Sequence, residues 1–315
     1  MSKYVPKIII HGGAINPDSG EFLEGIQKAI LEGMKILKSG GNALDAVTEA
    51  IYTLEQNPIF NAGKGAWPNL KGEVELDAII MDGKNLKAGA VAAVKNVKSP
   101  IKLARKIMEE TDHILIVGSG AEELARAFGL FEQHKVPEER LKQWQDIKQN
   151  LMLGKDVPLM SYWKKISKWA KIGDTVGAVA MDKEGSVAAG TSSGGFPMKL
   201  PGRVGDVPLI GCSTYADNEA GGVSITGHGE VVMTYTLAKR IVDLMREGYS
   251  AKFATEWMVN YINELTAGKA LLAVIAIDKN GNFGSARNTD KTPHAFMDET
   301  MNKPMFHFSK IITTQ

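Results

Sequence analysis

Only one cysteine, Cys212, occurs among the 315 residues of this sequence. A single cysteine can form neither an intrachain disulfide nor a multi-cysteine metal site, and it suits a reducing compartment. The first dozen residues lack the long apolar core of a secretory signal, and the sequence has no run of about 18 apolar residues. We therefore expect a cytoplasmic protein that has no membrane partner.

The sequence also has little net charge. Its 37 basic and 36 acidic residues leave a formal charge of +1, so electrostatics give no reason to expect binding to nucleic acid. Residues 161–171 are basic with interleaved aromatic residues, but in so neutral a chain a solvated segment is the simpler interpretation. The histidines are scattered without the spacing of a zinc site. A small molecule is the expected ligand.

Apolar periodicity predicts strands and helices in both halves of the chain. We expect strands at 7–11, 73–82, 88–94, 176–182, 186–191, 223–226, 271–278 and 282–288, and helices at 23–37, 43–56, 100–108, 237–245 and 251–265. Short turns rather than crossovers join several strands, which indicates antiparallel sheets covered by helices, an α+β fold. Residues 131–174 are charged and irregular, and we expect them to form a mobile linker.

The segment around Gly118 and Gly120 is similar to part of a nucleotide-binding motif. Gly118 and Gly120 follow an apolar run, as in the glycine-rich turn of a dinucleotide fold. The position of the third glycine holds Glu123, whose charge would repel a pyrophosphate. We interpret the segment instead as a helix start, with Glu122 and Glu123 complementing the helix dipole.

Thr175 stands at the start of an apolar strand, directly after the expected linker. A threonine hydroxyl is a poor nucleophile unless a base lies beside it, and its own α-amine, with a pKa of about 8, is the most economical base. That arrangement requires cleavage of the peptide bond between Asp174 and Thr175. Taken alone, the local pattern is explained more simply by a β-branched residue that opens a strand.

Four further motifs favour the catalytic interpretation. They are Ile-Ile-Ile-His-Gly-Gly-Ala at 8–14, Ala-Gly-Thr-Ser-Ser-Gly-Gly at 189–195, Lys-Leu-Pro-Gly-Arg-Val-Gly-Asp at 199–206 and Ile-Thr-Gly-His-Gly-Glu at 225–230. In this order they resemble the plant-type L-asparaginase and isoaspartyl aminopeptidase family, a branch of the N-terminal nucleophile hydrolases. The resemblance covers almost the whole chain.

The resemblance implies a fold and a maturation step. The fold is a four-layer αββα sandwich, with residues 1–315 forming one domain. Self-cleavage would divide the chain into residues 1–174 and 175–315, and the cleaved heterodimers would pair into a dimer. No cofactor is required.

The resemblance also implies a reaction. Thr175 would first attack the carbonyl of Asp174 and later the side-chain amide of L-asparagine or a β-aspartyl dipeptide. Many relatives carry glycine before the nucleophile, whereas Asp174 is similar to the residue in glycosylasparaginases and taspases. A hydrolase of either kind is therefore an alternative, and so is a binding protein of the same fold that never matures. The sequence lacks a secretion signal and disulfide cysteines, which argues against a glycosylasparaginase. It also lacks long inserts, which argues against a taspase.

Two hydroxyl groups are candidates to hold the nucleophile. Ser193 matches the position where relatives usually carry a second threonine that hydrogen-bonds the nucleophile. Serine keeps the hydroxyl and loses only a methyl group. Thr191 lies two residues earlier on the same face of the strand and could also serve, but the family motif favours Ser193.

Substrate binding is expected in the loop that contains Arg203 and Asp206. An α-amino acid presents a carboxylate and an ammonium, and a guanidinium with a carboxylate is the complementary pair. By the family motif, Arg203 binds the substrate carboxylate and Asp206 binds the ammonium. In general, such a pair is more often a surface ion pair that stabilises its own loop.

The motif at 225–230 is expected to form the oxyanion hole. Thr226 would contribute its hydroxyl and Gly227 its backbone N–H, aimed where negative charge develops. Gly227 and Gly229 would also let a small substrate approach the backbone. His228 is expected to line the pocket or face outward, because an N-terminal nucleophile already carries its base.

The resemblance implies two further features near residues 54–64. Asn61 is expected close to the active site. A structural sodium ion would be coordinated by backbone carbonyls of this loop, namely those of Leu54, Glu55, Asn57, Phe60, Ala62 and Lys64. Carbonyl ligation leaves no side-chain signature, so the sequence neither supports nor excludes the ion.

Overall fold

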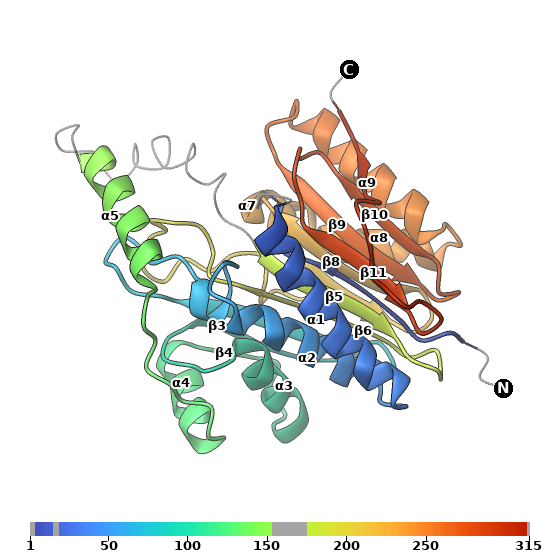
Figure 1. Ribbon diagram of the computed structural model, residues 1–315, viewed down its shortest axis with the longest axis horizontal. Coiled ribbons are helices and arrows are strands. Elements are labelled where there is room, and N and C mark those ends of the chain that lie inside the picture. The colour runs from blue at the N-terminus through green and yellow to red at the C-terminus, as the bar shows by residue number, and fades with distance from the viewer. Residues whose placement is uncertain (1–3, 15–18, 153–174, 314–315) are drawn as a thin grey trace.

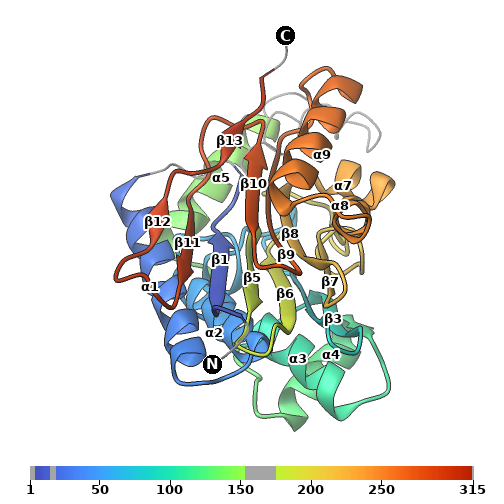
Figure 2. The same ribbon diagram turned by 90° about the vertical axis from the view of Figure 1, so that its right-hand side faces the viewer.

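Two stacked β-sheets form the centre of the protein (Figure 1). The computed structural model describes residues 4–14, 19–152 and 175–313, so Asp174 and the expected cleavage point lie outside the described residues. The larger sheet has the order β12-β11-β1-β5-β6-β2-β3-β4 and the smaller one β13-β10-β9-β8-β7. Figure 2 shows β1, β5 and β6 side by side at the centre of the larger sheet.

The strands of the larger sheet are β1 (Lys7–His11), β2 (Leu76–Asp82), β3 (Lys87–Val94), β4 (Leu115–Val117), β5 (Thr175–Met181), β6 (Val187–Ser193), β11 (His294–Asp298) and β12 (Met305–Phe306). Those of the smaller sheet are β7 (Thr214–Asp217), β8 (Gly221–Gly227), β9 (Leu272–Asp278), β10 (Phe283–Arg287) and β13 (Lys310–Ile311). Most neighbours are antiparallel, as expected. The pairs β3–β4 and β10–β13 are parallel.

The described residues form eight α-helices, most of which cover the outer face of one of the two sheets. They are α1 (Gly20–Lys38), α2 (Ala43–Gln56), α3 (Pro100–Glu110), α4 (Gly118–Ala127), α5 (Glu138–Met152), α7 (Gly229–Tyr235), α8 (Leu237–Arg246) and α9 (Ala251–Leu265), with a short 3₁₀ turn at Gly63–Gly65. One apolar core lies between the larger sheet and α1, α2 and α3, and another between the smaller sheet and α8 and α9. A third core, which includes Ile9, Val179 and Ile277, lies between the sheets. These four layers confirm the expected αββα sandwich.

Local sequence signals explain where several helices begin and end. Asn42 caps α2 by accepting a hydrogen bond from the backbone of Asp45, and Pro58 stands just beyond its end. Ser99 caps α3, and Pro100 occupies its first position. These are polar caps at the start of an apolar periodic run, so the bounds of both helices follow from the sequence.

The interpretation of the segment around Gly118 needs a correction. The strand and helix are present, as β4 and α4, but α4 already begins at Gly118 and has no acidic residue in its first turn. Glu122 and Glu123 therefore lie in the second turn of α4, past the first turn in which a carboxylate stabilises the helix dipole most.

The expected linker is also partly a helix. Within residues 131–174, α5 occupies 138–152, and residues 153–174 lie outside the described part of the chain. Trp144 and Ile147, one turn apart, are 8% and 5% exposed, so this charged helix is held against the protein by a narrow apolar stripe. No helix within residues 4–14, 19–152 or 175–313 is long and apolar enough to cross a bilayer.

Candidate active site

Thr175 lies at the end of a central strand, buried between its neighbours. As the first residue of β5 it is paired with Ser193, the last residue of β6, which is in turn paired with Asp77 of β2. The hydroxyl of Thr175 donates a hydrogen bond to Ser193 Oγ at 3.1 Å. Thr175 is only 7% exposed. The register of three strands therefore brings a candidate nucleophile, a hydroxyl partner and a carboxylate to the same end of the sheet.

The structure separates the roles of the two candidate hydroxyl groups. Thr191 hydrogen-bonds the hydroxyls of Thr214 and Ser224, the latter at 3.0 Å. Ser224 in turn contacts His11 Nε2 at 2.9 Å. Thr191 thus belongs to a buried polar chain between the sheets, whereas Ser193 is the residue that bonds Thr175.

His11 completes that polar chain behind Thr175. Burial lowers the pKa of its imidazole to about 3. The ring is therefore neutral at ordinary pH. A neutral imidazole can end the chain of hydroxyl groups without adding a charge to the site.

Asp206 is a buried carboxylate that lacks a full set of partners. It is 5% exposed, and its Oδ2 has no hydrogen-bond donor among the residues that the structure describes. Burial raises the pKa of Asp206 to about 7, and the nearby Arg203 opposes that rise. Because an unpaired buried carboxylate is costly, this arrangement suits a site that receives a cationic group from a ligand.

Arg203 is held on two sides. Its Nη2 and Nε donate to Glu230 Oε1 at 2.8 and 3.1 Å, and its guanidinium lies 4.5 Å from the centre of the Phe196 ring. Gly229 leaves the space between the two charged groups: a Cβ there would lie 2.6 Å from Asp206 Oδ1 and 2.9 Å from Arg203 Nη2. The ion pair and ring fix the orientation of a guanidinium that would bind an anion.

Thr226 and Gly227 lie at the end of β8. The hydroxyl of Thr226 is buried and finds no partner within the described part of the chain, and Thr226 is not among the residues that line the cavity of Thr175. At Gly227 the backbone has φ of +145°, and a Cβ would lie 2.1 Å from the Leu271 carbonyl oxygen. Only glycine fits there, and its backbone borders the cavity of Thr175.

His228 lines the same cavity but is engaged with the backbone. Its ring Nδ1 accepts a hydrogen bond from Leu271 N at 3.1 Å, and the backbone N–H of His228 donates to the Leu271 carbonyl at 2.9 Å. These bonds connect the start of α7 to the start of β9. They orient the ring as part of the turn, in agreement with a pocket-lining histidine.

The cavity at Thr175 is narrow in this structure, with a volume of about 20 Å³. That space holds about one water molecule, which is less than an amino acid needs. Its lining comes from five separate segments: Asp77, Thr175, Ser193, Gly195, Phe196, Arg203, Gly205, Asp206, Val207, Gly227, His228, Gly229 and Glu230.

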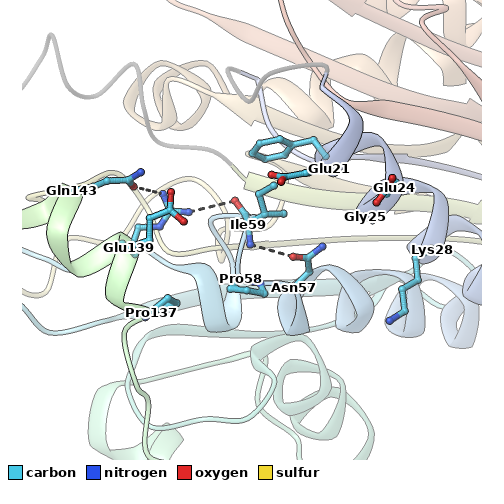
Figure 3. A pocket seen from close by; sticks show the side chains of 12 residues that line it. Glu21, Glu24, Gly25, Lys28, Asn57, Pro58, Ile59, Pro137, Glu139 and Gln143 are labelled. Carbon is cyan, nitrogen blue, oxygen red and sulfur yellow. Dashed lines mark hydrogen bonds between the residues drawn. The ribbon is translucent and has the colours of Figure 1, made fainter.

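A larger cavity of about 660 Å³ lies elsewhere, between α1, the end of α2 and α5 (Figure 3). Its charged lining residues include Glu21, Lys28 and Glu139. It shares no lining residue with the cavity of Thr175, and no serine, threonine or cysteine lines it. Size alone therefore does not identify the reactive site.

Comparison with known proteins agrees with the geometry. A family model described as asparaginase matches residues 4–306. The chain belongs to the asparaginase family. A plant-type L-asparaginase from Pyrococcus abyssi is 48% identical over 306 residues, which cover 94% of this chain and 98% of that protein. An isoaspartyl peptidase/L-asparaginase from Xenopus laevis is 40% identical over 316 residues, covering 98% of this chain and 97% of that protein.

In this asparaginase-family chain Asn61 holds the loop that follows Ser193. Its side-chain amide donates to the Gly195 carbonyl and its Oδ1 accepts from Trp67 N at 2.9 Å. The backbone carbonyl of Asn61 also accepts from Gly194 N at 2.9 Å. Asn61 therefore fixes the loop after Ser193, although it does not line the cavity of Thr175.

The loop at 54–64 packs closely against its own backbone carbonyl groups. A Cβ at Gly63 would lie 2.5 Å from the Glu55 carbonyl oxygen, and a Cβ at Gly65 would lie 2.1 Å from that of Phe60. Glycine at these two positions therefore lets the backbone lie directly against the two carbonyl oxygens. The carbonyls of Leu54, Asn57 and Ala62 also accept weak backbone hydrogen bonds, at 3.1 to 3.3 Å.

Asp77 and Lys199 are buried charged residues to which the sequence motifs assigned no role. Asp77 accepts hydrogen bonds from Ala93 N at 2.8 Å and Gly205 N at 3.3 Å, so it fixes the loop of Arg203 and Asp206. Lys199 is fully buried, donates to the Glu75 carbonyl at 2.8 Å, and has a pKa lowered by that burial. A charged residue inside the apolar strand 76–82 was the available signal for Asp77.

Glu55 is a third residue that the motifs did not reveal. Its carboxylate accepts hydrogen bonds from the Ser192 hydroxyl at 2.7 Å, the Ser99 hydroxyl and Ile101 N at 2.9 Å. Burial raises its pKa to about 7. The side chain connects α2, the start of α3 and β6 next to Ser193.

Proposed function

We propose that this protein is a self-cleaving threonine amidohydrolase that converts L-asparagine to L-aspartate and ammonia and also hydrolyses β-aspartyl dipeptides. One observation carries the proposal: Thr175, hydrogen-bonded to Ser193, shares a cavity with Arg203 and the incompletely paired Asp206. A nucleophile therefore lies beside groups complementary to an α-amino acid. The names of the relatives, plant-type L-asparaginase and isoaspartyl peptidase/L-asparaginase, support the same substrates.

Maturation would use the hydroxyl of Thr175. Its oxygen attacks the carbonyl carbon of Asp174, the C–N bond breaks, and the proton passes to the leaving nitrogen. The acyl group is then an ester on Thr175, which water hydrolyses. The products are the carboxylate of Asp174 and a free α-amine on Thr175, which becomes the base for later turnover.

In turnover the α-amine takes the proton of the Thr175 hydroxyl as that oxygen attacks the β-carbonyl carbon of the substrate. Arg203 binds the α-carboxylate and Asp206 the α-ammonium, which places the carbonyl at the nucleophile. The Thr226 hydroxyl and Gly227 N–H stabilise the oxyanion. Proton transfer to the leaving nitrogen releases ammonia or an amine, and water then hydrolyses the β-aspartyl ester.

Several features of this proposal rest on the resemblance of the sequence. The carbonyls of residues 54–64 would hold a sodium ion that stabilises the loop next to Asn61, and no other cofactor is needed. A dimer of cleaved heterodimers and a cytoplasmic location remain predictions. The names of the relatives favour asparagine over the substrates of a taspase-like or glycosylasparaginase-like hydrolase.

Mass spectrometry of purified protein tests the proposal directly. We expect two products, residues 1–174 and 175–315, which remain associated, together with release of ammonia from asparagine. Thr175→Ala should stay intact and inactive, whereas Thr175→Ser keeps a hydroxyl and should retain some cleavage. A fully active Thr175→Ala protein would refute the nucleophile, and an intact, inactive wild-type chain after long incubation would favour the non-maturing binding protein.

A further inference from the structure

Helix α5 packs against the body of the protein through an aromatic cluster. The buried side chains of Trp144 and Ile147 pack in a cluster with Trp67, Phe196 and Met198. Trp144 Nε1 also donates a hydrogen bond to the Asn69 carbonyl at 2.9 Å. A tryptophan that combines a buried ring with a satisfied N–H is a strong anchor for a helix that is otherwise charged.

The first turn of α5 supplies a second anchor. Arg140 donates to the Ile59 carbonyl at 3.3 Å. Its guanidinium also lies 4.1 Å from the centre of the Trp67 ring. Two attachment points one turn apart fix both the position and the rotation of the helix on the loop at 59–69.

The other side of this aromatic cluster is the substrate pocket. Phe196 lines the cavity of Thr175, and the guanidinium of Arg203 stacks on its ring at 4.5 Å. The loops on which the cluster is built are joined by backbone hydrogen bonds, Met198 N to the Pro68 carbonyl at 3.2 Å and Leu70 N to the Lys199 carbonyl at 2.9 Å. Phe196 is therefore the member of the cluster that contacts the side chain of Arg203.

We propose that α5 positions Arg203 through Phe196, and that Trp144 is the residue that does so. This inference rests on the proposed function, in which Arg203 binds the substrate carboxylate. Removal of the indole would leave a cavity in the cluster that contains Phe196, so the Phe196 ring and the stacked guanidinium would be held less firmly. Trp144 belongs to the N-terminal cleavage product and Arg203 to the C-terminal one, so the first product would contribute to substrate affinity after the chain is cut.

The effect is expected mainly in KM, because Arg203 contacts a carboxylate that does not react. In fully cleaved protein, Trp144→Ala should raise the KM for asparagine about tenfold, equivalent to about 1.4 kcal/mol of binding free energy. Its kcat should change far less. Trp144→Phe should restore part of the affinity. The matched control is Gln145→Ala, at an exposed position on the same helix, which should leave KM unchanged.

A double-mutant cycle tests whether the effect passes through Arg203. If it does, Trp144→Ala should lower kcat/KM in the wild-type background but have little further effect in the Arg203→Ala background. If Trp144→Ala does not fold, Ile147→Ala provides the same cycle on the same cluster.

Three outcomes would overturn the inference about α5: an unchanged KM in folded Trp144→Ala, a loss of kcat alone, or additive effects of the two substitutions. A loss of kcat alone would mean fewer folded molecules, which is a purely structural role. Failure of the proposed function is recognised separately, since wild-type protein would then release no ammonia from asparagine.

Discussion

Replacement of Asp206 by asparagine should make the protein more stable and much less active. Burial raises the pKa of this carboxyl from 3.8 to about 7. Between these pH values the folded protein binds the proton more tightly than the unfolded chain does. Stability therefore falls as pH rises from about 4 to 7, and the full penalty for the ionised carboxylate is present above about pH 7.

The size of the effect follows from the pKa. At about 1.4 kcal/mol for each pH unit, the rise from 3.8 to about 7 corresponds to at most about 4 kcal/mol. Asp206→Asn would remove the charge but place an amide N–H where Oδ2 has no partner within the described residues, which costs about 1–3 kcal/mol. We expect a net gain of about 1–3 kcal/mol, or roughly 2–5 °C in Tm for a chain of 315 residues.

Scanning calorimetry at pH 8 and pH 5 provides the assay, with Thr175→Ala as the background so that every chain is uncut. Asp206→Asn should raise Tm at pH 8, and its advantage should shrink at pH 5. The control is Asp217→Asn, another buried carboxylate, which pairs with Arg246 and accepts from Glu219 N at 2.9 Å; this change should lower Tm. A lower Tm for Asp206→Asn at pH 8 would show that the carboxylate is already well compensated.

Two further predictions separate binding from chemistry. Arg203→Ala should leave self-cleavage largely intact but reduce kcat/KM for asparagine by roughly ten- to a hundredfold or more, because a charge-assisted bond to the substrate carboxylate is lost; unchanged turnover with Thr175 still essential would make the loop structural. His228→Gln should preserve the rise of kcat with pH at saturating asparagine, since the α-amine of Thr175 is the base and the Nδ1 of His228 already accepts from Leu271 N; loss of that rise in cleaved protein would transfer the base role to the histidine.

Most of the helices and central strands could be predicted from the sequence because their signals are local. Helices 43–56 and 251–265 have the bounds that their apolar periodicity and flanking residues indicate. Strands β7 and β11 were missed because their short segments are defined by pairing with distant partners. Helix α5 was taken for linker because its apolar stripe, formed by Trp144 and Ile147, is narrow within a charged segment.

The candidate site divides in the same way. The motifs identified the residues expected to act on substrate, Thr175, Arg203 and Asp206 among them, and the structure brings these to one cavity. The motif favoured Ser193 over Thr191, but the sequence could not show what Thr191 does, because its hydroxyl partners Thr214 and Ser224 lie on the facing sheet. The sequence also could not show that Arg203 pairs with Glu230, because only the folded backbone brings α7 against the loop that contains Arg203.

The position of β5 between β1 and β6 has a consequence for the life of the cleaved protein. Cleavage before Thr175 would leave β1 and β5 as neighbours that belong to different polypeptides, held by an intact hydrogen-bonded ladder. The precursor can reach this arrangement in a first-order reaction, whereas the separated halves would have to find each other in solution. After self-cleavage, a molecule that unfolds would separate into two halves and would not readily refold. The lifetime of the mature protein would therefore depend on its unfolding rate.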